Sequence, residues 1–175
     1  MGNESGKSIV TLVIMTILIV IGASVIINYA KQMMEETKIQ DLKTNMLLMQ
    51  AETKKGLEEV CFRIVNLDKT KQEDLTKINE IKQEFLDGTP INDSPEEVQN
   101  AIKNVPEVTV DENCYYLDEA VLNEMGITDI DKEQFGYFVV KYDFANAGVE
   151  VINTKGYDGC YTLTHIVQAM EGGQS

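Results

Sequence analysis

Side chains able to carry out chemistry are few in this sequence, and they are scattered. His165 is the only histidine, and no serine or cysteine near it belongs to a nucleophile motif. The three cysteines, Cys61, Cys114 and Cys160, lack the paired spacing of a zinc site. We therefore expect no enzyme activity, no cofactor and no metal centre, and a surface or packing role for His165.

Two segments near the start imitate binding motifs, and each lacks a required residue. The run Gly2–Ser8 resembles a phosphate-binding loop, but it has three residues between its glycines where that motif has four. Met1-Gly2 fits the start of a myristoylation signal, but Gly6 stands where that signal has Ser or Thr. Neither motif is expected to function.

The acidic residues are best interpreted as a solvated surface. Asp129, Asp131 and Glu133 are spaced like the start of a calcium-binding loop, but Gln134 and Val140 occupy its glycine and glutamate positions. Residues 31–175 hold 28 of the 29 acidic and 14 of the 15 basic residues, so they carry the net charge of −14. A domain this acidic repels phosphate backbones, which excludes nucleic-acid binding as its main function.

The longest feature is an apolar segment without a single charge between Lys7 and Lys31. Its 23 residues span roughly 35 Å as a helix, enough to cross about 30 Å of hydrocarbon. A cleaved signal peptide has a shorter apolar region that ends in small residues, and this segment does not. The sequence predicts a short head at 1–6 and a transmembrane helix at 7–30. The flanking charges do not settle its orientation, because long domains cross membranes largely regardless of charge.

Residues 31–66 continue as a helix, because they contain good helix formers, no proline and only Gly56. Apolar residues recur at steps of three and four, which predicts one uninterrupted helix from about residue 8 to about residue 66. This stripe consists of Leu42, Met46, Met49, Leu57, Val60, Ile64 and Leu67. It needs a cover, and we expect the rest of the same domain rather than a coiled coil of identical chains.

The sequence after residue 66 predicts two further regions. Residues 67–106 form a helical connection: a helix over Leu75–Phe85 stops at Asp87–Pro90, and a second helix has Ser94 as its cap and Pro95 in its first position.

Residues 107–175 form a small antiparallel sheet domain. Its expected elements are strands at 107–110, 114–117, 136–144 and 149–154, a helix at 118–126 ending in a glycine cap, a turn at 128–132, and a strand or helix at 161–167. The fold class is α+β: a long N-terminal membrane-spanning helix packs on a small antiparallel β-sheet with short helices.

This order of elements, with the N-terminal residues, resembles the type IV pilin and type II secretion pseudopilin family. In that family a glycine ends a short leader, and a charge-free helix follows. If Gly6 is that glycine, residues 8–10 and 12–13 match the family in kind. Two positions differ: Lys7 is the first mature residue where the family has Phe or Met, and Thr11 is the fifth where it has Glu.

Parts of the soluble region also resemble pilin-like proteins of Clostridium-type Gram-positive bacteria, namely residues 41–52, 114–118, 148–156 and 161–163. The resemblance implies a structural filament subunit, either a pilin or a minor or pseudopilin. It implies a single-pass protein of the cell membrane with its C-terminal domain outside the cytoplasm. The implied partners are homologous subunits bound through the N-terminal helix, a prepilin peptidase that cleaves between Gly6 and Lys7, and a membrane assembly platform.

The alternative is an uncleaved single-pass membrane adaptor or sensor, with a helical stalk and a small partner-binding domain. A membrane-anchored enzyme is the third hypothesis, but the sequence offers no reactive cluster to support it. The mass of the mature N-terminus distinguishes the filament subunit, whose leader is cleaved, from the uncleaved adaptor or sensor.

Cys114 and Cys160 each precede a tyrosine in the β region. If the domain lies outside the cytoplasm, they are the predicted disulfide pair. Three reduced thiols are the open alternative.

Overall fold

The structure is a computed structural model that describes residues 4–106, 108–128 and 130–172, with side chains for residues 33–106, 108–128 and 130–171. The chain divides into two compact units, Met1–Asp41 and Leu42–Ser175. Among the residues with described side chains, no helix has both the length and the apolar character needed to cross a membrane. The predicted span at 7–30 lies outside those residues.

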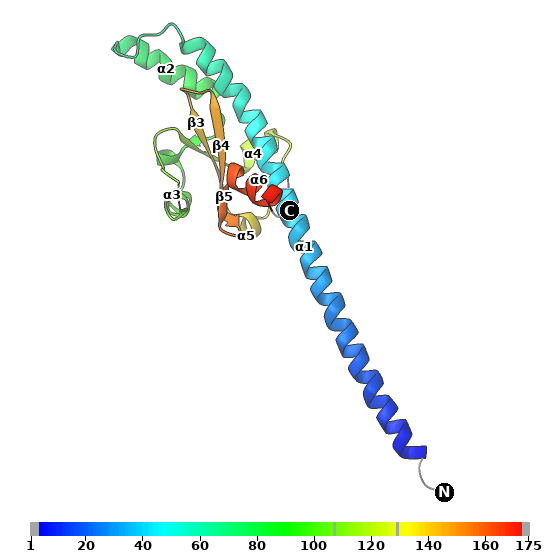
Figure 1. Ribbon diagram of the computed structural model, residues 1–175. Helices are drawn as coiled ribbons and strands as arrows, with labels where there is room; N and C mark the ends of the chain where they lie inside the picture. The colour runs from blue at the N-terminus through cyan, green and yellow to red at the C-terminus, as the bar shows by residue number, and fades with distance from the viewer. Residues whose placement is uncertain (1–3, 107, 129, 173–175) are drawn as a thin grey trace. The chain divides into compact units, whose positions relative to one another are not determined.

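Helix α1 runs from Glu4 to Ile64 (Figure 1), so the predicted uninterrupted helix is confirmed and ends two residues early. Its apolar stripe is covered by the chain's own domain, as expected. Met46, Met49, Leu57 and Val60 have no exposed surface. Burying four such side chains stabilises the domain by roughly 1.5–3 kcal/mol each.

The predicted helical connection is present with changed details. Helix α2 spans Gln72–Phe85, a single 3-10 turn η1 spans Ile91–Asp93, and α3 spans Glu96–Lys103. The prediction that Ser94 caps α3 was wrong, because its hydroxyl donates to the Ile91 carbonyl oxygen at 2.7 Å instead. Pro95 is consequently the N-cap residue of α3 rather than its first helical residue.

Five antiparallel strands form one sheet in the order β1-β2-β3-β4-β5. Their bounds are β1 Thr89–Pro90, β2 Cys114–Leu117, β3 Phe138–Asp143, β4 Gly148–Tyr157 and β5 Cys160–Thr162. The predicted hairpin is confirmed: β3 pairs with β4 from Phe138↔Asn153 to Asp143↔Gly148. The α+β class with an antiparallel sheet is thereby confirmed for the described residues.

The predicted strand at 107–110 was wrong, since residues 108–110 pair with no strand. Val108 and Val110 pack against a core cluster instead, which explains their apolar character. Helix α4, Glu119–Glu124, has the predicted glycine after its end, Gly126 with φ +77°. Residues 160–172 supply both of the expected alternatives, strand β5 followed by helix α6, Leu163–Gly172.

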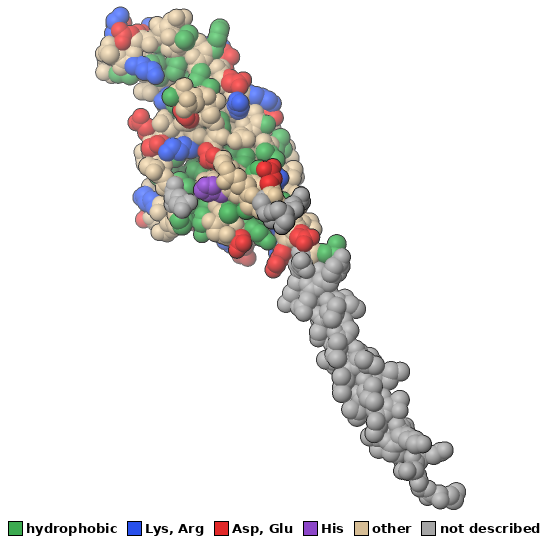
Figure 2. Space-filling view, in the orientation of Figure 1, with side chains coloured by type: hydrophobic (Ala, Val, Ile, Leu, Met, Phe, Trp, Pro, Cys, Tyr) green, Lys and Arg blue, Asp and Glu red, His purple; other side chains and the backbone are tan. Residues whose placement is uncertain are grey.

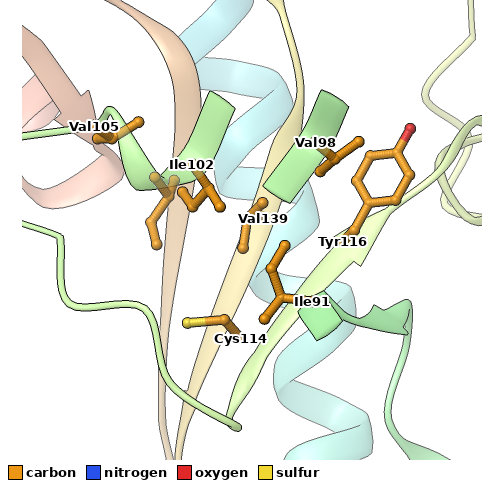
Figure 3. Close-up of a cluster of buried hydrophobic side chains, with 8 residues drawn as sticks. Ile91, Val98, Ile102, Val105, Cys114, Tyr116 and Val139 are labelled. Carbon is orange, nitrogen blue, oxygen red and sulfur yellow. The ribbon is translucent and has the colours of Figure 1, made fainter. Parts of the chain in front are cut away.

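The two faces of the sheet pack against different helices, because neighbouring residues of a strand point to opposite faces. Figure 3 shows the cluster on one face, where β2 and β3 contribute Cys114, Tyr116 and Val139, and α3 contributes Val98 and Ile102. On the opposite face, residues 42–64 of α1 lie along the strands (Figure 1). That face is also buried, through Tyr115, Leu117, Phe138, Val140, Tyr142 and Val151.

Candidate functional site

The predicted processing residues Gly6, Lys7 and Thr11 lie outside the residues whose side chains are described. The described side chains contain no group of three or more His, Cys, Asp or Glu residues able to hold a metal ion. Candidate functions of the described part therefore rest on how it holds α1 and on the surfaces that it exposes.

Cys114 and Cys160 are not brought together. All three cysteines are free thiols. Cys114 lies on β2 and Cys160 on β5, with β3 and β4 between them. Their strands are three strand spacings apart, about 14 Å, and the register adds to this distance, because Cys114 is level with Glu150 whereas Cys160 pairs with Tyr157 at the other end of β4. A disulfide needs Cα atoms within about 7 Å. Burial raises the pKa of the Cys114 thiol, which favours its neutral form.

The calcium-like segment has a structural role in its described part. The Asp131 carboxylate accepts hydrogen bonds from the backbone N–H groups of Glu133 and Gln134, at 2.8 and 3.3 Å, and so caps the short helix α5, Lys132–Phe135. Asp129 lies outside the described residues. His165 is exposed on α6 (Figure 2).

Helix α1 is tied to the sheet by polar contacts as well as by apolar packing. The Gln50 side-chain amide donates to the Val149 carbonyl oxygen of β4 at 2.8 Å. The Tyr142 hydroxyl of β3 donates to the Asp87 carbonyl oxygen at 3.0 Å, which links the sheet to the segment after α2. Burial raises the pKa of Tyr142 above its usual range.

Gly56 lets α1 approach the end of α2 closely. A Cβ atom at this position would overlap the Phe85 carbonyl oxygen and lie 3.3 Å from the carbonyl carbon. The Arg63 guanidinium lies over the Phe85 ring, 4.3 Å from its centroid, so α1 contacts Phe85 on two sides. In the sequence, Gly56 is notable only as the single glycine of residues 31–66, and its packing role depends on a contact that no local pattern encodes.

A cleft of about 790 Å³ lies where β2 ends and β3 begins. Tyr116 and Tyr137 line it, with ring centroids 6.0 Å apart and planes at 80°. Helix α4 and the segment around α5 complete its wall through Leu122, Ile127 and Ile130, with Glu119 and Asp131 among its charged residues. Sequence reasoning missed this cleft, since the Tyr-Tyr pair in β2 indicated only a strand.

The described outer surface of α1, and the residue just after its end, carry exposed apolar side chains. They are Met33, Met34, Leu47, Leu48, Phe62 and Val65, and Phe62 is 77% exposed. Acidic and basic side chains are interspersed on the visible face of the domain (Figure 2).

No family model, no curated protein and no solved structure matches the chain.

Proposed function

We propose that this chain is a structural subunit of a type IV pilus or type II secretion-like filament, held in the membrane by its N-terminal helix before assembly. One observation carries the proposal. The 61-residue helix α1 joins a segment with no charge between Lys7 and Lys31 to a stripe that packs on an antiparallel sheet. This combination of a charge-free helix and a covered amphipathic continuation is what the pilin resemblance implies.

Such a function is physically possible because lipid and a bundle of identical helices are similarly apolar environments for an apolar helix. Lipid tails are as apolar as Ile, Val and Leu, so helix association in a membrane depends on packing rather than on a hydrophobic driving force. A subunit can therefore move from bilayer to filament core at modest cost. The acidic domain, which carries the net charge of −14, would stay in water in both states.

The two residues at the start of the helix that differ from the family's pattern favour a minor or pseudopilin role. In the family, the fifth-position Glu neutralises a neighbour's N-terminal amine inside the filament. Thr11 carries no charge to do so, and Lys7 adds a positive charge at the same place. Unpaired charge in an apolar environment is costly, so self-assembly of many copies would be weak.

The test is the intact mass of the chain after co-expression with an active prepilin peptidase. We expect removal of the first six residues, and Gly6→Val should block the removal because a side chain at the cut obstructs access to the backbone. Gly2→Val is the matched control and should leave cleavage unchanged. Copurification with a second pilin-like subunit, dependent on cleavage, would then support the filament.

An uncleaved membrane adaptor or sensor is the second candidate, and the same two residues, Lys7 and Thr11, favour it. An intact N-terminus in cells whose peptidase cleaves a control prepilin would reject the filament proposal. The adaptor would then be the better explanation, with the domain as its partner-binding part.

A further inference from the structure

The cleft at the ends of β2 and β3 has the dimensions of a ligand site. Its volume of about 790 Å³ lies within the range of roughly 300–1,000 Å³ that small-molecule sites occupy. It lies entirely within the unit Leu42–Ser175. It uses none of the residues assigned to membrane anchoring or processing.

Aromatic rings form one wall of the cleft. Tyr116 and Tyr137 pack edge to face at a centroid distance of 6.0 Å. Figure 3 shows the Tyr116 ring beside Val98 with its hydroxyl pointing away from the core cluster. The face of a tyrosine ring attracts cations through its quadrupole, by about 0.5–2 kcal/mol depending on desolvation.

The charged groups around the rings are mostly acidic. Glu119 and Asp131 line the cleft, and Lys132 is the one basic residue among the described residues of its lining. The Lys132 ammonium lies 4.0 Å from the Glu119 carboxylate, and both side chains are more than half exposed, so this ion pair is weak. Outside the lining, burial and the nearby Glu97 carboxylate raise the pKa of the Tyr137 hydroxyl. A cleft lined by an excess of one charge concentrates ligands of the opposite charge.

The walls of the cleft are fixed by hydrogen bonds. Asp118 caps α4 by accepting from the Val121 N–H at 3.0 Å. The Asn153 side-chain amide donates to the Phe135 carbonyl oxygen at 2.6 Å. The Tyr137 N–H donates to the Thr154 hydroxyl at 2.8 Å. Such a preformed site loses little conformational entropy when a ligand binds.

We propose that this cleft binds an organic cation, that is, an apolar or aromatic body carrying an ammonium or guanidinium group. The aromatic wall and the apolar residues Leu122, Ile127 and Ile130 would contact the body of the ligand. The carboxylates of Glu119 and Asp131 would lie near its charge. The ligand is either a free amine or a basic side chain of a peptide, and both present the same chemistry. This binding does not depend on the filament function.

The test is isothermal titration calorimetry on the full chain in a maltoside detergent, which contains no amine. Phenethylammonium is compared with 2-phenylethanol, a neutral molecule of nearly the same size, and with acetyl-phenylalanyl-arginine amide. We expect both cations to bind about tenfold or more tightly than the alcohol. If only the arginine peptide binds, the source is a peptide segment, and if only phenethylammonium binds, it is a free amine.

Two variants locate the binding. The double change Glu119→Gln and Asp131→Asn removes both charges, keeps a capping side chain on α5, and should weaken cation binding about tenfold. The matched control Glu80→Gln with Glu84→Gln removes two exposed charges from α2 and should leave binding unchanged. Any one of three results would overturn the proposal. They are equal affinity for phenethylammonium and 2-phenylethanol, equal weakening of binding by the control variant, and no cation binding at 10 mM ligand, roughly the weakest affinity these interactions allow.

Discussion

Replacing Gly56 by alanine tests how α1 is held, because helix propensity and packing predict opposite signs. In an exposed helix interior, Gly→Ala stabilises by about 1 kcal/mol. Here the new Cβ would overlap the Phe85 carbonyl oxygen, which belongs to the backbone and cannot rotate away. The two helices must separate by about 1.5–2 Å to restore ordinary contact distances of roughly 3.5–4.0 Å.

That separation would weaken the packing on either side of Gly56. A gap of about 1 Å already forfeits up to half of the dispersion energy of the contacts that it opens. Leu57 and Val60 are fully buried next to this position, and each contributes roughly 1.5–3 kcal/mol through burial. After the gain in helix propensity is subtracted, Gly56→Ala should lower the free energy of unfolding by about 1–3 kcal/mol.

The assay is urea unfolding followed by circular dichroism, with the free energy of unfolding extrapolated to water. Ala51→Gly is the matched control, since Ala51 is exposed on the same helix and should lose only about 1 kcal/mol. A Gly56→Ala variant that is more stable than the natural chain would refute the close approach of α1 to α2.

Three further substitutions have defined outcomes in the same unfolding assay. Ala147→Gly should stabilise by about 0.5–1 kcal/mol, because Ala147 has φ +48° in the β3–β4 turn; no gain would mean that this backbone is unstrained. Asn153→Ala should cost about 2–4 kcal/mol, because its buried side chain accepts from the N–H groups of Lys155 and Gly156 and donates to Phe135. Burial, with Glu52 and Glu124 nearby, raises the pKa of Asp87, so the folded state holds this proton more tightly than the unfolded chain. The contribution of Asp87 to the free energy of unfolding therefore falls as pH rises from about 3.9 through the higher folded pKa. Compared with the natural chain, Asp87→Asn should be more stable at pH 7 than it is at pH 3. A stability difference between the two proteins that does not change with pH would contradict this.

The elements predicted correctly are those whose stability is local or periodic. The stripe of α1 fixed both its helical state and its buried face, since steps of three and four residues leave one side of a helix apolar. Helix α4 was predicted with its terminal glycine because Gly126 follows the helix end and donates its N–H to the Asn123 carbonyl oxygen. The hairpin of β3 and β4 follows from two β-rich runs joined by a short turn.

The errors fall where distant residues decide the conformation. Thr89 and Pro90 form a strand only because they pair with Tyr116 and Tyr115 of β2. No pattern in a two-residue segment could have indicated this.

The β4–β5 hairpin is different, because its indicator was present in the sequence and overlooked. Asp158 and Gly159 have φ +48° and +79°, the left-handed pair of a two-residue turn that Asp-Gly favours. Tyr157 pairs with Cys160 across it.

The two parts of the long helix place different demands on their surroundings. Residues 42–64 are apolar along one stripe, and the rest of the domain covers that stripe completely at Met46, Met49, Leu57 and Val60. Residues 8–30 contain no charged residue and are mostly apolar, and a helix of that composition needs an apolar environment. Within the described part of the chain, the α3 cluster covers one face of the sheet and residues 42–64 of α1 cover the other. Lipid, or the same segment of other chains, is the environment that would meet this demand, and exchange between the two is the physical step on which the proposed filament function depends.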